Sequence, residues 1–322
     1  NFEVVIVDDS STDGSWELIR SRFGKLRNVR ISRNKTKRLA AGARNVGVKL
    51  ARGEYIALLD HDIEVSRSWL KEAMKVFRKY PKAGVVQGRV LDMTRRNIIQ
   101  HAGIRINSYL GWVIALGFGQ DATEKCLDEI EIFANATGLI FKKKVWQDIG
   151  GFDEDLAINT DDWDFNWRVW LYGYKEILAP KSITYHWSKK QKTRDRWIKR
   201  LSWEFHFAKV PWIFIKNYEL KNLIRVLPVY LLVNLFRGLF NLLFRLNPTP
   251  LLAYFGALGW TAYHFPKLLR KREIVMKNKR TPDKYLLDHV MDNGFVFSYF
   301  LKHWLPIFKL GRLMSTEKPY SK

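Results

Sequence analysis

Short apolar runs alternate with helix-like patterns over the first 190 residues. Residues 4–7 are apolar and mostly β-branched, a polar turn follows at 8–14, and apolar positions from Trp16 to Phe23 then predict a helix. Further along the chain we expect strands at 29–32, 55–59, 83–90, 136–141 and 183–186, and helices at 40–51, 145–149 and about 160–172. This alternation predicts an α/β, Rossmann-like domain with a mostly parallel sheet and helices on both faces.

The pattern changes near residue 201. Residues 223–246 are largely apolar, and on a helix starting after Pro228 the polar positions fall within about 80° of one another: Asn234, Arg237, Asn241 and Arg245. A second apolar stretch, 251–265, is short for the roughly 20 residues of a membrane span, and a basic run follows at 267–280. We expect two helices in the interface of an anionic membrane. A transmembrane hairpin and an ordinary helical subdomain packed on the sheet are alternatives.

The change of pattern near residue 201 therefore predicts two parts: an α/β domain over residues 1–200 and a helical, basic, membrane-associated region over 201–322. The chain of 322 residues carries 55 Lys and Arg against 32 Asp and Glu, a net charge of +23. Such an excess indicates nucleic acid, an anionic membrane or phosphorylated ligands. The sequence shows no helix-turn-helix, zinc-finger or RNP-like signature, which disfavours nucleic acid as a partner. The single cysteine, Cys126, excludes a disulfide framework and a cysteine-based zinc site.

Acidic residues follow two of the expected strands. Asp8 and Asp9 end the first strand, and Asp60 and Asp62 follow the buried strand at 55–59. Because ligands bind outside the carboxyl ends of strands in such sheets, we expect both groups to face one crevice. Two carboxylates spaced by one residue can hold a divalent cation that bridges phosphates. Solvation at the surface explains most isolated pairs of this kind, but the position after a buried strand favours the functional interpretation.

Two further groups of residues have both a structural and a functional interpretation. Asp161 and Asp162 lie in the first turn of the helix expected from Thr160, where carboxylates stabilise the helix dipole. One of them could also project from the helix start as a general base. His186 ends a strand and is followed by seven Lys and Arg residues between 189 and 200, among them Lys189 and Arg194. Such a concentration of cations beside the histidine indicates phosphate binding.

The order of these motifs resembles glycosyltransferase family 2. The motifs are residues 2–15, 43–47 with 53–62, and 150–154 with 161–168. The resemblance covers about residues 1–190 and implies a GT-A fold that inverts the anomeric centre of a nucleotide-sugar donor. Residues 98–103 and 136–138 are similar to the rhamnosyltransferase-type branch, which builds surface polysaccharides.

The resemblance also implies roles for individual residues. It gives Asp9 to the donor base, Asp60 and Asp62 to the ribose and the metal-bound diphosphate, and the catalytic base to Asp162. His186 aligns with a histidine near the metal, so the expected ligands of Mg2+ or Mn2+ are Asp62, Asp60 and His186. We place four more residues in the donor site: Asp8, Arg44, Lys189 and Arg194.

The sequence departs from the family pattern in three places. The first strand and helix of the family are absent, so we expect an N-terminally truncated domain. Asp161 stands where the family has Glu, which leaves the aligned base in place. The spacing from Gln191 to Trp197 differs from the Gln-x-x-Arg-Trp of processive members, which favours transfer of single sugars.

The expected protein is a metal-dependent inverting glycosyltransferase that moves a hexose or rhamnose from a nucleotide-sugar donor to a lipid-linked or glycan acceptor. We expect it at the cytoplasmic face of the cell membrane, bound peripherally or by a short hairpin. A catalytically silent, membrane-bound assembly partner is the main alternative, and a basic nucleic-acid-binding protein is less favoured.

Overall fold

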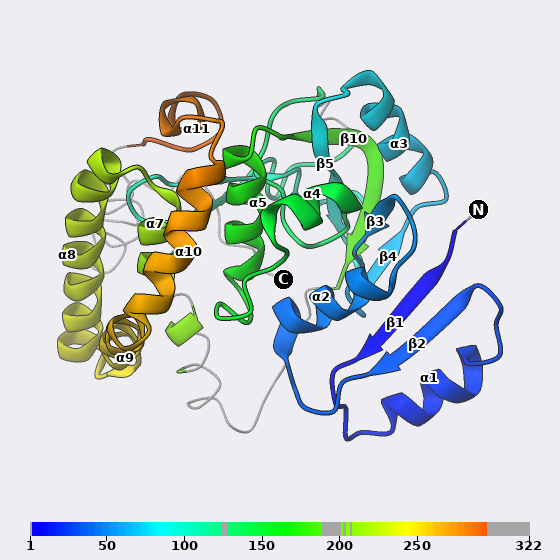
Figure 1. Cartoon of the computed structure of the whole chain (residues 1–322), viewed down its shortest axis with the longest axis horizontal. Helices are drawn as coiled ribbons and strands as arrows, with labels where there is room; N and C mark the ends of the chain where they lie inside the picture. The colour runs from blue at the N-terminus through cyan, green and yellow to red at the C-terminus, as the bar shows by residue number, and fades with distance from the viewer. Residues whose placement is uncertain (1, 124–127, 188–200, 202–203, 207, 295–322) are drawn as a thin grey trace.

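The computed structural model describes residues 2–123, 128–187, 201, 204–206 and 208–294. Up to residue 187 the structure contains every strand and helix that the hydrophobic pattern predicts, and in addition β4, α3 and three short strands between β5 and β9 (Figure 1). The strands are β1 (Val4–Asp8), β2 (Val29–Arg33), β3 (Tyr55–Ala57), β4 (Ile63–Val65), β5 (Ala83–Asp92), β6 (Ile99–His101), β7 (Ile104–Ile106), β8 (Val113–Ala115), β9 (Leu139–Lys142) and β10 (Lys175–His186). The helices are α1 (Ser15–Phe23), α2 (Leu39–Leu50), α3 (Trp69–Lys79), α4 (Lys143–Ile149) and α5 (Asp161–Leu171).

The main sheet is mixed. Its order is β3-β9-β5-β10-β4, with β6 added beside β5. β5 and β10 are parallel, whereas β9 runs antiparallel to both β3 and β5, and β4 runs antiparallel to β10. β1 and β2 pair in parallel in a separate two-stranded sheet. The α/β class is therefore confirmed, but the expected mostly parallel pairing is wrong, because β9 follows a long irregular segment instead of a crossover helix.

Helices cover both faces of the main sheet, as expected. On one face α3 packs Trp69, Ala73 and Phe77 against Val86 and Ile177. On the other face α4 and α5 pack against β5 and β9. All eleven residues of α5 are buried, so the acidic start of this helix is held rigidly by the core.

The C-terminal helices share the core of the α/β layer. They are α7 (Val210–Asn217), α8 (Leu220–Arg245), α9 (Thr249–Tyr263), α10 (Phe265–Asn278) and α11 (Asp283–His289). Trp167 of α5 meets the ring of Tyr218 edge to face, with centroids 4.7 Å apart. Figure 1 shows these helices gathered on the side of the molecule opposite β1, β2 and α1.

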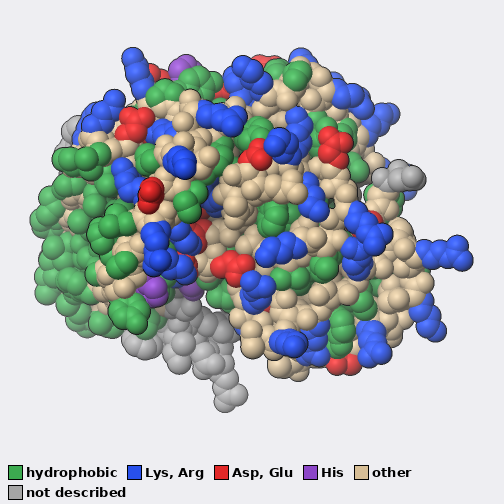
Figure 2. Space-filling view, viewed as in Figure 1, with side chains coloured by type: hydrophobic (Ala, Val, Ile, Leu, Met, Phe, Trp, Pro, Cys, Tyr) green, Lys and Arg blue, Asp and Glu red, His purple; other side chains and the backbone are tan. Residues whose placement is uncertain are grey.

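Helix α8 differs from its expected form in two ways. It begins at Leu220 and contains Pro228, so the expected start after Pro228 is wrong. Its polar stripe is turned inward, because Asn234 and Asn241 are buried. Large apolar side chains of the same helix are exposed: Leu220, Ile224, Leu232, Phe236, Leu239, Leu243 and Phe244. Figure 2 shows them as a continuous apolar surface over α8.

Helix α8 is also the one helix in the described part of the chain that is long and apolar enough to cross a membrane. It has 26 residues, and its mean hydropathy reaches 1.7, with 28% of that stretch buried inside the protein. Length and composition alone are weak evidence for a span. The exposure of its apolar side is the stronger observation, since soluble proteins rarely expose large contiguous apolar patches.

Candidate active site

The start of α5 carries the candidate base. Asp162 is almost fully buried, and its carboxylate accepts hydrogen bonds from the backbone amides of Ala136 (3.1 Å) and Trp163 (3.0 Å). Thr160 stands at the N-cap position, but its side chain makes no cap hydrogen bond. The structure thus places Asp161 and Asp162 in the first helical turn as predicted, and the backbone fixes the orientation of Asp162.

Arg44 connects this helix start to the loop after β3. Its guanidinium donates to Asp161 at 2.7 Å and lies 3.3 Å from a carboxylate oxygen of Asp60. Arg44 comes from α2, so three segments far apart in the sequence meet at one side chain. We call the group formed by Asp60, Asp62, Asp161 and Asp162 the acidic site.

The buried pair at the helix start has an unusual protonation equilibrium. Burial raises the pKa of Asp161 to about 7 against the opposing charge of Arg44, and neighbouring Asp162 adds to the increase. Burial also raises the pKa of Asp162, while Arg44 and backbone donors act in the opposite direction. The pKa of each carboxyl is therefore shifted toward neutral pH, and a general base works best when its pKa lies near the operating pH.

Asp62 and His186 lie together, as the sequence predicts. The Nε2 atom of His186 is 3.5 Å from a carboxylate oxygen of Asp62, because β10 and β4 pair antiparallel with His186 opposite Ile63. The Nδ1 atom of His186 is 2.8 Å from Oε1 of Gln100. A proton on Nδ1 would donate to Gln100 and leave Nε2 free as a ligand.

These residues make a partial metal site. Among the described residues, no three His, Cys, Asp or Glu side chains come together as a complete ligand set, and Asp60 lies beside Arg44. Mg2+ is commonly bound by one or two protein carboxylates together with substrate phosphates. The Asp62 and His186 pair fits a cation that is completed by a diphosphate.

Asp8 and Asp9 hold the loop after β1. Asp9 accepts hydrogen bonds from the amides of Arg38 (2.9 Å) and Leu39 (2.8 Å) at the start of α2 and from Asn34 (2.8 Å). Asp8 is buried and lies 3.2 Å from the guanidinium of Arg33. Because Arg44 lies on the same helix, α2 connects Asp9 to the acidic site. The donor-binding roles of Asp8 and Asp9 stay predictions.

Two predicted donor residues, Lys189 and Arg194, lie outside the described residues.

The segment that supports Asp162 depends on a residue that the sequence did not single out. Gln87 is fully buried in β5 and donates to the carbonyls of Asn135 (2.6 Å) and Thr137 (2.9 Å), while it accepts from the amide of Asn135 (2.9 Å). These bonds fix the backbone on both sides of Ala136, whose amide donates to Asp162. A glutamine inside the apolar run of β5 was the available signal. Gln100 lies in the stretch 98–103 that carries part of the resemblance, but nothing in the sequence connected it to His186.

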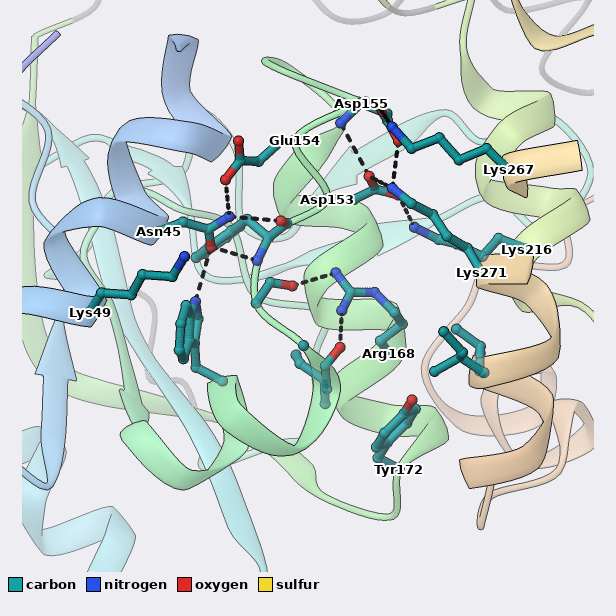
Figure 3. A pocket seen from close by; sticks show the side chains of 17 residues that line it. Asn45, Lys49, Asp153, Glu154, Asp155, Arg168, Tyr172, Lys216, Lys267 and Lys271 are labelled. Carbon is teal, nitrogen blue, oxygen red and sulfur yellow. Dashed lines mark hydrogen bonds and ion pairs between the residues drawn. The ribbon is translucent and has the colours of Figure 1, made fainter. Parts of the chain in front are cut away.

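A second group of carboxylates lies beyond the acidic site, around the loop 150–155 (Figure 3). Asp153 pairs with Lys216 of α7 and Lys271 of α10, and Lys216 also lies 2.7 Å from Asp164. We call this group, completed by Asp155, Lys267 and Arg168, the charged cluster. It borders a hollow of about 400 Å³. Although burial opposes ionisation, Lys216 and Lys271 hold the pKa of Asp153 well below its usual range.

The loop in the charged cluster needs a glycine. Gly151 has a φ of +77°, and a Cβ there would approach Oδ1 of Asn45 to 2.8 Å. Arg168 of α5 donates to the carbonyls of Ile149 (2.6 Å) and Gly151 (2.8 Å). The Gly-Gly-Phe-Asp-Glu motif therefore joins α2, α5 and the C-terminal helices into one unit.

Comparison with known proteins decides the family. The family model described as glycosyl transferase family 2 matches residues 1–148. Residues 1–148 of this chain belong to glycosyltransferase family 2. The TarS fragment 1–349 from S. aureus, solved in complex with UDP-GlcNAc, has a similar fold, with a TM-score of 0.52 at 17% identity over 86% of this chain and 80% of that chain. The GT-A-like α/β class is thereby confirmed.

Curated relatives point in the same direction. The amylovoran biosynthesis glycosyltransferase AmsB of Erwinia amylovora is 35% identical over 58% of this chain and 60% of its own length. The UDP-Glc:alpha-D-GlcNAc-diphosphoundecaprenol beta-1,3-glucosyltransferase WfaP of Escherichia coli is 47% identical over 64 residues, 19% of this chain and 24% of its own.

A further relative is named as inactive. The inactive polypeptide N-acetylgalactosaminyltransferase-like protein 5 of Macaca fascicularis is 26% identical over 59% of this chain and 45% of its own length. This chain aligns with only 24% to 60% of the length of these curated relatives.

Proposed function

We propose that this chain is an inverting glycosyltransferase that transfers a single sugar from a nucleotide-sugar donor to a lipid-linked or polysaccharide acceptor in cell-surface glycan synthesis. The observation that carries the proposal is the buried Asp161 and Asp162 pair, joined through Arg44 to Asp60. Arg44 and Asp60 lie within the residues that match family 2, and the pair follows 13 residues after the end of that match. The relatives that take part in amylovoran biosynthesis and that act on a diphosphoundecaprenol-linked sugar support the acceptor class.

In the proposed reaction Asp162 is the base. An acceptor hydroxyl attacks the anomeric carbon, its oxygen forms the new glycosidic bond, and its proton passes to the Asp162 carboxylate. The bond from the anomeric carbon to the diphosphate oxygen breaks, and the nucleoside diphosphate leaves with that electron pair. Arg44 stands between the helix start and Asp60 and keeps Asp161 and Asp60 from repelling each other.

We propose that Asp62 and His186 hold a divalent cation, Mg2+ or Mn2+, with the donor diphosphate. The cation would neutralise charge on the leaving phosphates. Gln100 positions His186 for this role. If chelation with EDTA leaves transfer unchanged, this assignment is wrong.

We also propose that the exposed apolar side of α8 lies against a membrane, with the basic helix α10 near anionic headgroups. The inward polar stripe supports an apolar environment outside α8, because a helix in water would turn these faces the other way. Binding to liposomes that does not depend on their composition or on salt would contradict the electrostatic part of this proposal. We propose that the protein binds the cytoplasmic face of the membrane.

A panel of nucleotide sugars tests the proposed activity. Each donor is offered with Mn2+, and donor hydrolysis and thermal stabilisation of the protein are measured. We expect one nucleotide class to stabilise the protein and to be hydrolysed slowly. Stabilisation without turnover by any donor would favour the second candidate, a catalytically silent assembly partner, which the similarity to a relative named inactive supports.

A further inference from the structure

A cavity lies between α5, the start of β8 and helix α8. It has a volume of about 380 Å³ and is lined by Trp163 of α5, Trp112 and Val113 at the start of β8, and Tyr230, Asn234 and Arg237 of α8. Binding sites for small molecules commonly occupy about 300–1,000 Å³. Trp163 directly follows Asp162, so α5, the helix that carries the candidate base, lines this cavity together with the apolar helix α8.

Arg237 gives the cavity a specific chemistry. Its guanidinium pairs with Glu204 at 2.6 Å, and its Nε atom is buried without a hydrogen-bond partner among the described residues. A buried donor left unpaired costs free energy that an oxygen ligand would recover. The guanidinium binds phosphate oxygens in a forked geometry better than any other side chain. The cavity wall therefore carries an unmet preference for an anionic oxygen ligand.

Helix α8 links this polar wall to an apolar surface. Tyr230, Asn234 and Arg237 recur at helical spacing on the inner side, while Leu232, Phe236 and Leu239 are exposed on the outer side. Figure 2 shows the outer side chains as a broad apolar surface. One helix thus offers an anion-binding position and a hydrocarbon-binding face, which suits a ligand that has a phosphate head and a long apolar chain.

We propose that this cavity binds the phosphate or diphosphate of a prenyl-linked acceptor, with Arg237 on the phosphate and the prenyl chain along the outer side of α8. The acceptor sugar would then project past Trp163 toward Asp162. This inference rests on the proposed glycosyltransferase function and names its acceptor. It assigns Arg237 to acceptor binding and leaves the donor to the acidic site.

The test measures binding to vesicles without any donor. Phosphatidylcholine vesicles carry undecaprenyl phosphate in one arm and an amount of phosphatidylglycerol with equal charge in the other, and inorganic diphosphate alone is a third arm. We expect tighter binding to the prenyl phosphate vesicles than to the phosphatidylglycerol vesicles. Equal binding in the two vesicle arms would mean that only an anionic surface is recognised, and complete competition by inorganic diphosphate would mean that only a free phosphate is recognised; either would overturn the proposal.

A matched pair of variants localises the effect. Arg237→Gln should weaken binding to prenyl phosphate vesicles by about tenfold or more, as expected for a lost hydrogen bond to a charged group. Arg245→Gln removes the same charge from an exposed position on the same helix and should leave the preference for prenyl phosphate intact. Equal losses in both variants would show that Arg237 acts only through net charge, and the proposal would be wrong.

A third variant separates binding from folding. Glu204→Gln removes the carboxylate that competes for Arg237, so we expect prenyl phosphate binding to increase. If Glu204→Gln and Arg237→Gln lose binding and thermal stability alike, the pair is only structural and the proposal fails. Stabilisation by UDP with Mn2+, measured in parallel, reports the donor site, so that failure of the glycosyltransferase function can be distinguished from failure of this acceptor site.

Discussion

The acidic site and the charged cluster use the same residue type for opposite purposes. Both draw buried carboxylates from α5: Asp161 and Asp162 belong to the acidic site, and Asp164 belongs to the charged cluster with the buried Asp153. In the charged cluster Asp153 and Asp164 each meet two cations, and the pKa of each carboxyl is lowered by those charges in spite of burial. In the acidic site Asp161 and Asp162 share the single cation Arg44, and burial raises both pKa values.

The difference shows that the supply of cations, rather than burial, decides what a carboxylate does here. Lys216 and Lys271 come from α7 and α10, so the C-terminal helices complete the charged cluster and leave the acidic site incomplete. A fully paired carboxylate stabilises the fold and cannot easily accept a proton. A buried carboxylate with too few neighbouring cations costs stability, but it can accept a proton in a reaction.

The largest expected effect comes from removing the base. Asp162→Asn should lower the rate of sugar transfer by about 10²–10⁴-fold, the usual contribution of a general base. The free energy of unfolding should stay unchanged or rise slightly, because a neutral amide replaces a buried carboxyl whose ionisation is unfavourable. Transfer to the acceptor and urea unfolding measure the two quantities.

Donor binding is the control for this variant. Stabilisation by UDP with Mn2+ should persist, since Asp62 and His186 are unchanged. A variant that retains turnover would show that Asp162 is not the base. The difference in pKa between the two groups of carboxylates would then have no role in catalysis.

The same substitution in the charged cluster should act on stability. Asp153→Asn leaves Lys216 and Lys271 without their shared partner, and we expect a loss of about 3–5 kcal/mol in the free energy of unfolding, as for other broken buried pairs. Because the pKa of Asp153 is lowered on folding, its contribution should be present above the ordinary pKa of 3.8 and should be lost as the pH falls below it.

Asp148→Asn is the matched control for this prediction. Asp148 pairs with the exposed Lys144 on α4 at 3.0 Å and accepts a hydrogen bond from the hydroxyl of Tyr174. A surface pair and a single exposed hydrogen bond each contribute about 1 kcal/mol. Similar losses from Asp148→Asn and Asp153→Asn in urea unfolding would contradict the structural role given to the charged cluster.

The sequence predicted the members of the acidic site better than their partners. Strand ends and helix starts can be located from apolar runs and caps, so Asp62, His186 and Asp162 were placed correctly in space relative to their elements. The sequence could not show that Lys216 and Lys271 would neutralise Asp153. Each of these lysines lies more than 60 residues from Asp153 in the chain and reaches it only through the packing of α7 and α10.

The same limit explains the errors in the fold. Hydrophobic periodicity gives the faces of α8 but not which face meets the protein, and here Asn234 and Asn241 turn inward. Periodicity also does not give strand direction, so β9 was expected to be parallel and is antiparallel. Pairing and helix orientation depend on contacts between distant segments, which local patterns do not contain.

A smaller effect should appear in the pH dependence of transfer. The base must be ionised, so transfer should rise with pH toward the pKa of the pair, which is raised to about 7 for Asp161. Asp161→Asn removes the like charge beside Asp162, and the rise should move to lower pH. The pH profile of the transfer rate measures this shift.

A stability readout accompanies the pH profile. Because the pKa of Asp161 is raised from 3.8 to about 7, the folded state retains a proton that the unfolded state has lost, and stability should fall as the pH rises between these values. Asp161→Asn should flatten this decline. An unchanged profile in both measurements would mean that the two carboxyls titrate independently.

The smallest effect should come from a buried carboxyl that belongs to neither group. Glu176 of β10 is fully buried, one oxygen accepts from the amide of Ala134 at 2.7 Å, and burial raises its pKa well above the usual range. The raised pKa favours the neutral acid, and Glu176→Gln keeps its shape and the acceptor for Ala134. We expect a change of about 1 kcal/mol or less in the free energy of unfolding and an unchanged transfer rate. A loss as large as that of Asp153→Asn would mean that Glu176 is ionised, and burial would then not suffice to keep a carboxyl neutral in this fold.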